Sequence, residues 1–291
     1  MQNNERSLHH LEKIVAGLAL AAVLALAVGF AQGAGPKDPD KVFLRSAVAL
    51  VQDAASGETL IAKNQEVILP IASITKLMSA IVILEAKVVL EQRVAISEED
   101  TDLVKGTRSR LRAGSVLTRD QLLLLALMSS ENRAAAALGR TYPGGTEAFV
   151  AAMNAKARSL GMDDTRFVDA SGLSSGNVSS ARDLVRLVIA AHEFPLIREY
   201  TTRESATVRA LGRPLGYRNT NGLVRSAQWD IGLSKTGYIS EAGRCLVMRV
   251  RLASRELVVV LLDSWGKFSR VGDANRIRKW LESNAAAGRR G

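Results

Sequence analysis

Residues 229–262 read WDIGLSKTGYISEAGRCLVMRVRLASRELVVVLL, and the fold is decided within this stretch. Apolar side chains recur with a period of two in three runs, 229–237, 244–252 and 256–262, which short turns separate. Because a parallel pair of strands needs a long crossover, strands joined by such short turns are antiparallel neighbours. The C-terminal third of the chain is therefore predicted to contribute three antiparallel strands to one sheet.

The rest of the chain predicts helices in the middle and further strands near the N-terminus. Residues 43–51 and 59–63 are typical of a hairpin. Apolar residues at helical spacing predict a helix from Ser73 to about Val89. Further helices are predicted at 118–128, 132–140, 147–160, 180–192 and 268–284, with a Ser/Gly/Asn loop at 170–179. Strands at both ends of a helical middle indicate one α+β domain, whose sheet is completed by distant segments.

The composition excludes several functional classes. The single cysteine, Cys245, excludes an internal disulfide framework and a thiolate metal cluster, and we expect it to be a small buried hydrophobe. No HExxH or GxxxxGK[ST] motif occurs, so we expect no metal and no cofactor. The net charge of +10 is scattered and aromatic residues make up only 4%, which argues against nucleic acid. The charge suits an anionic polymer, a membrane surface or simple solubility.

The N-terminus carries a predicted export segment. Residues 14–30 are uncharged and apolar, and small residues at 31 and 33 form a typical cleavage site. The charges before the apolar run cancel, which is unusual for a signal peptide. We favour a cleaved signal at 1–33 over a retained membrane anchor, followed by a linker at 34–41. In either case the remainder of the chain is exported.

Ser73-Ile74-Thr75-Lys76 stands at the start of the first predicted helix. An N-cap serine there would be ordinary, but a capping box has Glu or Gln three residues on, not Lys. A cation in the first turn opposes the helix macrodipole, at a cost of about 0.3–1 kcal/mol. Residues three apart share a helix face, so a neutral Lys76 amine could take the Ser73 hydroxyl proton. Burial and a second cation would lower the lysine pKa enough for this role.

Two further short motifs could complete such a site. Lys235-Thr236-Gly237 lies on a predicted strand, where Lys235 interrupts an apolar row and Gly237 allows another backbone to approach closely. Strand-end lysines are otherwise usually solvated. Ser130-Glu131-Asn132 lies between two predicted helices, where it could cap the second helix or supply a hydroxyl and an amide to a substrate.

The joint occurrence of the three motifs is more specific than any one of them. By average composition, SxxK or SxN occurs about once by chance in a chain of this length, and KTG in roughly one chain in ten. Together and in this order, S-x-x-K, S-x-N and K-T-G are typical of penicillin-binding proteins and class A β-lactamases. A Ser-His-Asp hydrolase would need His192, which is expected at the surface. The three tryptophans are expected in the core rather than as substrate platforms, namely Trp229, Trp265 and Trp280.

From about residue 42 to 283, the chain resembles the serine D-Ala-D-Ala peptidases, and within them the D-alanyl-D-alanine endopeptidases of the penicillin-binding protein 7 type. The resemblance is carried by IASITKLMSA (71–80), LMSSENRAAAALGRTYPGG (127–145), MNAKARSLGMDDTRFVDASGLSSGNVSSARDL (153–184), RNTNGLV (218–224), LSKTGY (233–238) and AGRCLVMR (242–249). It implies the β-lactamase/transpeptidase-like fold, a five-stranded antiparallel sheet flanked by helices with an inserted helical lobe. The expected division is a sheet lobe at 42–90 and 203–285, a helical lobe at 91–202 and a tail at 286–291.

The resemblance also implies roles for particular residues. Ser73 would be the acyl-ester nucleophile and Lys76 its proton acceptor, with Ser130 and Asn132 across the cleft. Lys235, Thr236 and Gly237 would hold the substrate. Backbone N–H groups of Ser73 and Tyr238 would form the oxyanion hole.

The implied reaction is hydrolysis of the D-Ala–diaminopimelate bond in peptidoglycan cross-links, in the periplasm, with β-lactams acylating the same serine. The chain is expected to lack the C-terminal β-domain and anchor helix of the carboxypeptidase branch. Position 131 is Glu where class A β-lactamases have Asp, and their deacylating Glu-x-x-x-Asn is not found. A D-Ala-D-Ala carboxypeptidase, a β-lactamase and a non-catalytic peptidoglycan-binding module remain as alternatives.

Overall fold

Five antiparallel strands form the central sheet of the computed structural model, which describes residues 42–288. The spatial order is β2-β1-β11-β10-β9. The strands are β1 (Ser46–Asp53), β2 (Thr59–Lys63), β9 (Asp230–Ile239), β10 (Gly243–Leu252) and β11 (Arg255–Ser264). β1 pairs with β11 from Ser46↔Ser264 to Asp53↔Leu257, so the two ends of the chain complete one sheet, as predicted. The predicted signal segment and linker lie outside the described residues.

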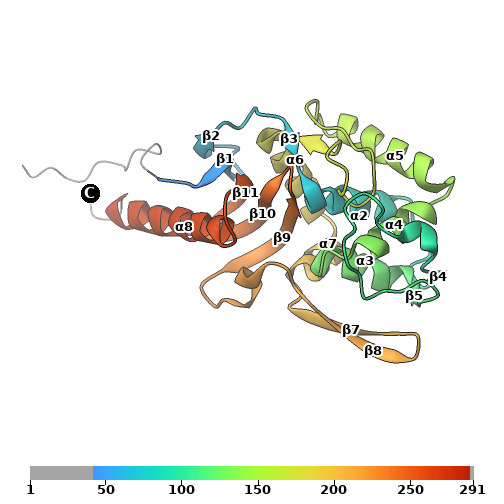
Figure 1. Cartoon of the computed structure of the whole chain (residues 1–291). Helices are drawn as coiled ribbons and strands as arrows, with labels where there is room; N and C mark the ends of the chain where they lie inside the picture. Colours follow the sequence, from blue (N-terminus) through green and yellow to red (C-terminus); the bar gives the residue numbers. More distant parts are fainter. Residues whose placement is uncertain (1–41, 289–291) are drawn as a thin grey trace, which may run out of the picture.

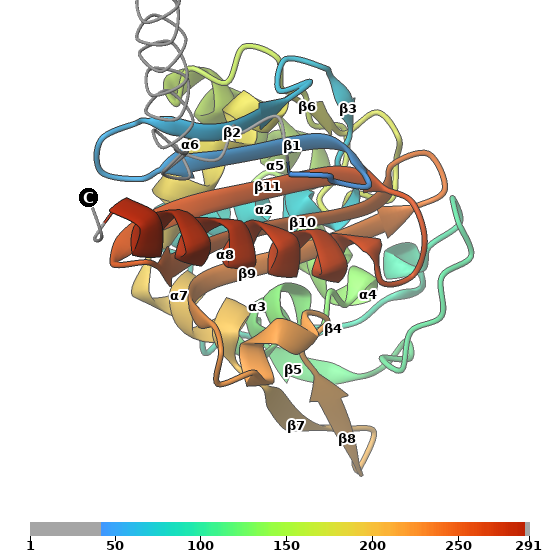
Figure 2. The same cartoon turned by 90° about the vertical axis from the view of Figure 1, so that its left-hand side faces the viewer.

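Both faces of the sheet are covered (Figure 2). Helix α8 (Ser269–Gly288) lies across one face, and α2 (Thr75–Glu85) and α6 (Ala181–His192) lie behind the other. Along β11, Val259 and Leu261 face the α8 side, whereas Val258, Val260 and Leu262 face the α2 side. This double coverage explains why β11 is apolar at every position in its centre rather than alternating.

The helical lobe contains α3 (Arg119–Met128), α4 (Asn132–Arg140), α5 (Gly145–Ser159) and α7 (Pro195–Thr202). Short pairs join β3 (Leu69–Pro70) to β6 (Val178–Ser179) and β4 (Arg93–Ala95) to β5 (Val116–Thr118). Single turns are η2 (Ala72–Ile74), η3 (Glu98–Asp100) and η4 (Gly222–Arg225). A separate hairpin, β7 (Ser205–Ala210) and β8 (Arg213–Arg218), projects below the sheet in Figure 1. Over residues 42–288, no helix combines the length and the apolar character that a membrane span requires.

The structure corrects several local predictions. The helix predicted from Ser73 to about Val89 starts as a 3₁₀ turn and ends at Glu85, because Lys87 adopts φ 50°, which ends an α-helix. Helix α7 and the β7–β8 hairpin were not predicted. Trp265 is 87% exposed, so the prediction of a core position was wrong for it. It lies in the short link between β11 and α8, where neither core cluster reaches it.

The burial of the other tryptophans and of the cysteine agrees with the prediction, and that of His192 differs from it. Trp229 and Trp280 pack in the cluster beneath α8, and Cys245 is fully buried, as predicted. His192 ends α6 and is half-buried rather than at the surface. Its imidazole packs against β9 at Gly232, where a Cβ would lie only 3.1 Å from Nε2.

Asp273 ties α8 to β1. The carboxylate is fully buried and accepts hydrogen bonds from the backbone N–H groups of Arg45 (3.0 Å) and Ser46 (2.7 Å) and from the Ser46 hydroxyl (2.5 Å), with Arg276 beside it. Burial alone would raise the Asp273 pKa, but these hydrogen bonds outweigh it and lower the pKa. A lowered carboxyl pKa stabilises the folded state above about pH 4, and this contribution is lost as the pH falls through the folded-state value.

We therefore expect Asp273→Asn to lower the free energy of unfolding at pH 7 by about 3 kcal/mol, because it disrupts a buried charged acceptor. The deficit relative to the wild type should shrink below pH 4, measured by urea unfolding at both pH values. Asp230→Asn is the matched control, because it removes an exposed carboxylate at the start of β9 and should change the free energy of unfolding little. An equal deficit at both pH values would contradict the electrostatic role of Asp273.

Candidate active site

Ser73 and Lys76 lie together at the junction between η2 and α2. Lys76 Nζ stands 2.8 Å from Ser73 Oγ, so the three-residue spacing places both on one face, as predicted. Lys76 Nζ also donates to Asn132 Oδ1 and to the Ser171 carbonyl, both at 2.7 Å. These two oxygens can only accept. A neutral Lys76 amine therefore uses its two N–H groups on them and keeps its lone pair for the Ser73 hydroxyl proton.

Burial makes such a neutral amine accessible near neutral pH. Lys76 is 1% exposed, whereas Ser73 is half-buried and open to a ligand. Loss of hydration lowers the Lys76 pKa to about 7, although the charges of Asp169, Glu131 and Asp102 raise it in part. The Lys76 pKa is thus matched to proton transfer near neutral pH.

A second amine and hydroxyl pair faces the first. Lys235 Nζ donates to Ser130 Oγ at 2.9 Å and to the Thr236 carbonyl at 2.9 Å. Burial lowers the Lys235 pKa well below its ordinary value, and the positive charges of Lys76 and Arg270 lower it further. Ser130 itself has φ 60°, a left-handed backbone that is uncommon for serine. Such strain is typical of functional sites that the surrounding structure holds in place.

The strand that carries Lys235 passes very close to the Ser73 turn. A Cβ at Gly237 would lie 2.9 Å from the Ile71 carbonyl oxygen and 3.2 Å from the Ser73 nitrogen. Only glycine allows this approach, which brings the backbone following Gly237 beside Ser73. Tyr238 is 58% exposed at this end of the edge strand β9. Thr236 Oγ1 donates to Thr220 Oγ1 at 2.6 Å, just before η4.

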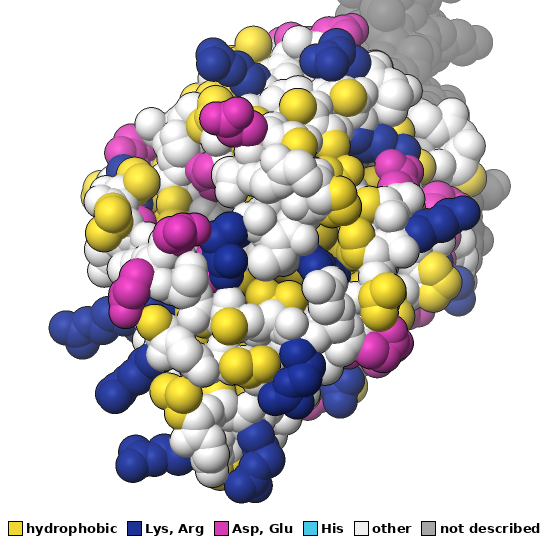
Figure 3. All heavy atoms as spheres, turned by 90° about the vertical axis from the view of Figure 1, so that its right-hand side faces the viewer, with side chains coloured by type: hydrophobic (Ala, Val, Ile, Leu, Met, Phe, Trp, Pro, Cys, Tyr) yellow, Lys and Arg dark blue, Asp and Glu magenta, His cyan; other side chains and the backbone are white. Residues whose placement is uncertain are grey.

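The structure therefore brings all eight predicted site residues together, namely Ser73, Lys76, Ser130, Asn132, Lys235, Thr236, Gly237 and Tyr238. Figure 3 shows the face of the molecule on the side of the helical lobe. This face is hollowed near its middle, and basic and apolar side chains line the bottom of the hollow.

Sequence reasoning missed the loop that holds the Ser171 carbonyl on Lys76. Asp169 Oδ1 accepts from the backbone N–H groups of Ser171 and Gly172, both at 2.6 Å. Asn177 Nδ2 donates to Thr75 Oγ1 at 3.0 Å and so fastens the same loop to α2. A Cβ at Gly172, which has φ +81°, would stand 2.0 Å from the Ala72 carbonyl oxygen. The available signal is the Ser/Gly/Asn loop at 170–179, which lies within the family-like segment 153–184 but was not assigned a part in the site from the sequence.

A serine whose hydroxyl meets a buried lysine amine, with a second lysine and serine opposite, defines a serine hydrolase that does not depend on histidine. The chain belongs to the D-alanyl-D-alanine carboxypeptidase family of peptidases, which matches residues 36–265. It is 47% identical over 266 residues to the D-alanyl-D-alanine endopeptidase of Pseudomonas aeruginosa, covering 89% of this chain and 86% of that protein. With the D-alanyl-D-alanine endopeptidase of Escherichia coli it shares 46% identity over 242 residues, covering 82% and 78%.

More distant relatives carry another name. The D-alanyl-D-alanine carboxypeptidase DacF of Bacillus subtilis is 30% identical, over 76% of this chain and 57% of that protein. The solved Streptomyces K15 DD-transpeptidase superposes with a TM-score of 0.76 at 26% identity, covering 83% of this chain and 98% of that one. The β-lactamase/transpeptidase-like fold that the motifs predicted is thereby confirmed, as is the resemblance to the endopeptidases.

Proposed function

We propose that this protein is a serine D,D-endopeptidase that hydrolyses D-alanyl cross-links of peptidoglycan through an acyl-ester on Ser73. The observation that carries the chemistry is the Lys76 amine, which two carbonyl oxygens orient so that its lone pair faces the Ser73 hydroxyl. The choice of endopeptidase over carboxypeptidase is supported by 47% identity to a curated endopeptidase against 30% to the carboxypeptidase DacF.

Acylation begins when Lys76 takes the Ser73 proton and Oγ attacks the D-alanyl carbonyl carbon. The backbone N–H groups of Ser73 and Tyr238 donate to the oxygen that becomes negative. As the tetrahedral intermediate collapses, the C–N bond breaks and the amine of the second peptide leaves with a proton relayed through Ser130, whose hydroxyl accepts a hydrogen bond from Lys235 Nζ. Asn132 and Thr236 hold the peptide on either side.

Water then resolves the ester. It loses a proton to Lys76, attacks the same carbonyl, and returns Ser73 as the free hydroxyl while the D-alanyl carboxylate departs. Penicillins would form the same ester and stay bound, because the opened ring remains attached and blocks the approach of water.

We propose that residues 42–285 act as one catalytic domain in the periplasm, with the sheet lobe and helical lobe as divided above. The apolar segment 14–30 and the net charge of +10 support export and contact with an anionic wall polymer or membrane surface. Comparing the intact mass of the purified periplasmic protein with that of the full chain tests cleavage after Gly33.

Digestion of purified muropeptides tests the reaction itself. Cross-linked dimers should fall to monomers with Ser73-dependent kinetics, and pentapeptide monomers should release D-alanine much more slowly. Release of D-alanine without loss of dimers would replace the endopeptidase by a carboxypeptidase.

A further inference from the structure

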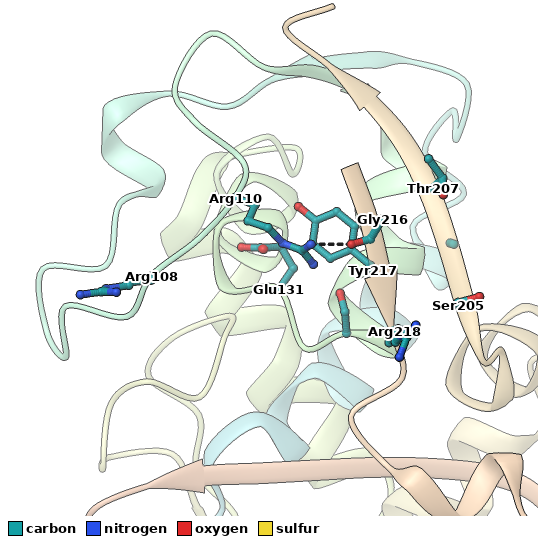
Figure 4. Close-up of a pocket in the computed structure, with 10 residues that line it drawn as sticks. Arg108, Arg110, Glu131, Ser205, Thr207, Gly216, Tyr217 and Arg218 are labelled. Carbon is teal, nitrogen blue, oxygen red and sulfur yellow. Dashed lines mark hydrogen bonds between the residues drawn. The ribbon is translucent and has the colours of Figure 1, made fainter. Parts of the chain in front are cut away.

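A cavity of about 690 Å³ opens beside Ser130, between the β7–β8 hairpin, the 108–110 loop and the α3–α4 junction. Ser129 and Glu131, the two sequence neighbours of Ser130, both line it. Figure 4 shows Glu131 and Arg110 facing one another at its centre, with Arg218 at the end of the hairpin. The cavity thus lies next to the residue whose hydroxyl is proposed to protonate the leaving amine.

Within residues 42–288, the arginines of this cavity have no carboxylate at salt-bridge distance. These arginines are Arg108, Arg110 and Arg218. The Glu131 carboxylate is 9% exposed and accepts from the Arg133 backbone N–H at 3.2 Å. Unpaired guanidinium groups around a cavity favour a ligand with carboxylates, which they bind in a bidentate manner.

Part of this lining is held rigid. The Arg110 guanidinium stacks 4.1 Å from the centre of the Tyr217 ring and donates to the Gly216 carbonyl at 2.5 Å. Tyr217 is 3% exposed, and within the described part of the chain its hydroxyl has no hydrogen-bond partner. Burial, together with the Glu131 charge, raises the Tyr217 pKa to about 12 despite Arg110, so the hydroxyl keeps its proton. A buried donor without a partner is costly unless a water or ligand atom meets it.

The cavity is also joined to the substrate strand. The Thr220 backbone N–H donates to the Met128 carbonyl at 3.2 Å, and the Thr220 hydroxyl accepts from Thr236. Arg218 stands two residues before Thr220, at the end of β8. The segment 218–220 therefore connects the substrate strand at Thr236 with the cavity at Arg218.

We propose that this cavity binds the leaving half of the cross-linked substrate. A carboxylate of the leaving peptide binds the guanidinium groups of Arg218 and Arg110, and the amine of the leaving peptide lies toward Glu131. The inference rests on the proposed endopeptidase function and makes the cavity its specificity determinant. The leaving amine of a cross-link belongs to a diamino acid within a second peptide, which carries carboxylates and needs space. The leaving group of a carboxypeptidase is a single D-alanine, which would fill only a small part of such a cavity.

Arg218→Gln tests this proposal, because Arg218 is exposed and its loss leaves no buried group unpaired. We expect kcat/KM for a cross-linked muropeptide dimer to fall about tenfold, mainly through KM, as for a partly solvated charge-assisted hydrogen bond. Acylation by fluorescent penicillin, which has no leaving peptide, should stay within about twofold of the wild type. Arg209→Gln removes an exposed arginine of the same hairpin that does not line the cavity, and it should change neither rate.

A dimer whose leaving diamino acid is amidated provides the second arm. On this substrate kcat/KM of the wild type should fall by about the same factor as Arg218→Gln loses on the charged dimer. Arg218→Gln should cleave the amidated dimer no more slowly than the wild type does, as in a double-mutant cycle. Unchanged cleavage of the charged dimer by Arg218→Gln, or an equal loss of penicillin acylation, would overturn the proposal. The proposed function fails separately: it requires that the wild type cleave dimers with Ser73, whatever the Arg218 variant does.

Discussion

Replacing Ser73 by alanine is expected to abolish labelling by fluorescent penicillin and to lower dimer hydrolysis by about 10⁴-fold or more, as for other covalent nucleophiles. The reason is that no ester can form without the Ser73 oxygen, which is the hydroxyl that meets the Lys76 amine at 2.8 Å. Labelling is followed on a denaturing gel, and hydrolysis by separating dimers from monomers.

Ser79→Ala is the matched control for this experiment. Ser79 lies on the same helix, is 3% exposed, and donates to the Ala170 carbonyl at 2.7 Å. Its loss should reduce stability modestly and leave labelling intact, because its hydroxyl points away from the cleft into the core. Equal labelling of Ser73→Ala and the wild type would falsify the assignment of the nucleophile.

Lys76→Arg is expected to lower acylation by about 10³-fold, within the range of a lost general base. Arginine keeps a positive charge and donors for Asn132 and Ser171, but a guanidinium cannot be deprotonated at working pH. For the wild type, the neutral amine is the active form. Because burial lowers the Lys76 pKa to about 7, the acylation rate should rise with pH through about 7 and then level off. Stopped-flow acylation between pH 5 and 9 measures this profile.

Lys63→Arg provides the control for the change of side chain. Lys63 is also partly buried and donates to the Leu44 and Ser46 carbonyls, on the β2 side of the sheet away from the cleft. It should acylate at the wild-type rate. A Lys76→Arg variant with normal acylation, or a wild-type rate that falls as the pH rises from 5 to 7, would remove Lys76 from the role of base.

Local periodicity was enough to predict most elements. The helices at 119–128 and 132–140 and the strand at 59–63 agree with expectation to within a residue, because each carries its own apolar pattern and end signals. The helix after Ser73 ended early, since the left-handed backbone of Lys87 is not visible in an apolar pattern. Trp265 was misplaced because a large apolar side chain predicts burial only when an element covers it.

The side chains of the candidate site were predicted more completely than its backbone groups. Lys76 and Lys235 stood out because each departs from an ordinary structural role, and Ser73 and Ser130 because the three motifs occur together. The Ser171 carbonyl that orients Lys76 could not be recognised, because every residue has a carbonyl and only the fold decides where it points. Arg218 could not be singled out either, because the sequence contains many arginines and only the position of the hairpin places this one at the cavity.

The sequence by itself determined most of the strands and helices and the kind of chemistry, since these depend on residue types and on spacings of a few positions. Only the tertiary structure decided that Lys235 meets Ser130 across 105 positions and that both lysines lose their water. Hydration is removed by packing between distant segments, and that removal shifts an amine from a solvated cation toward a base.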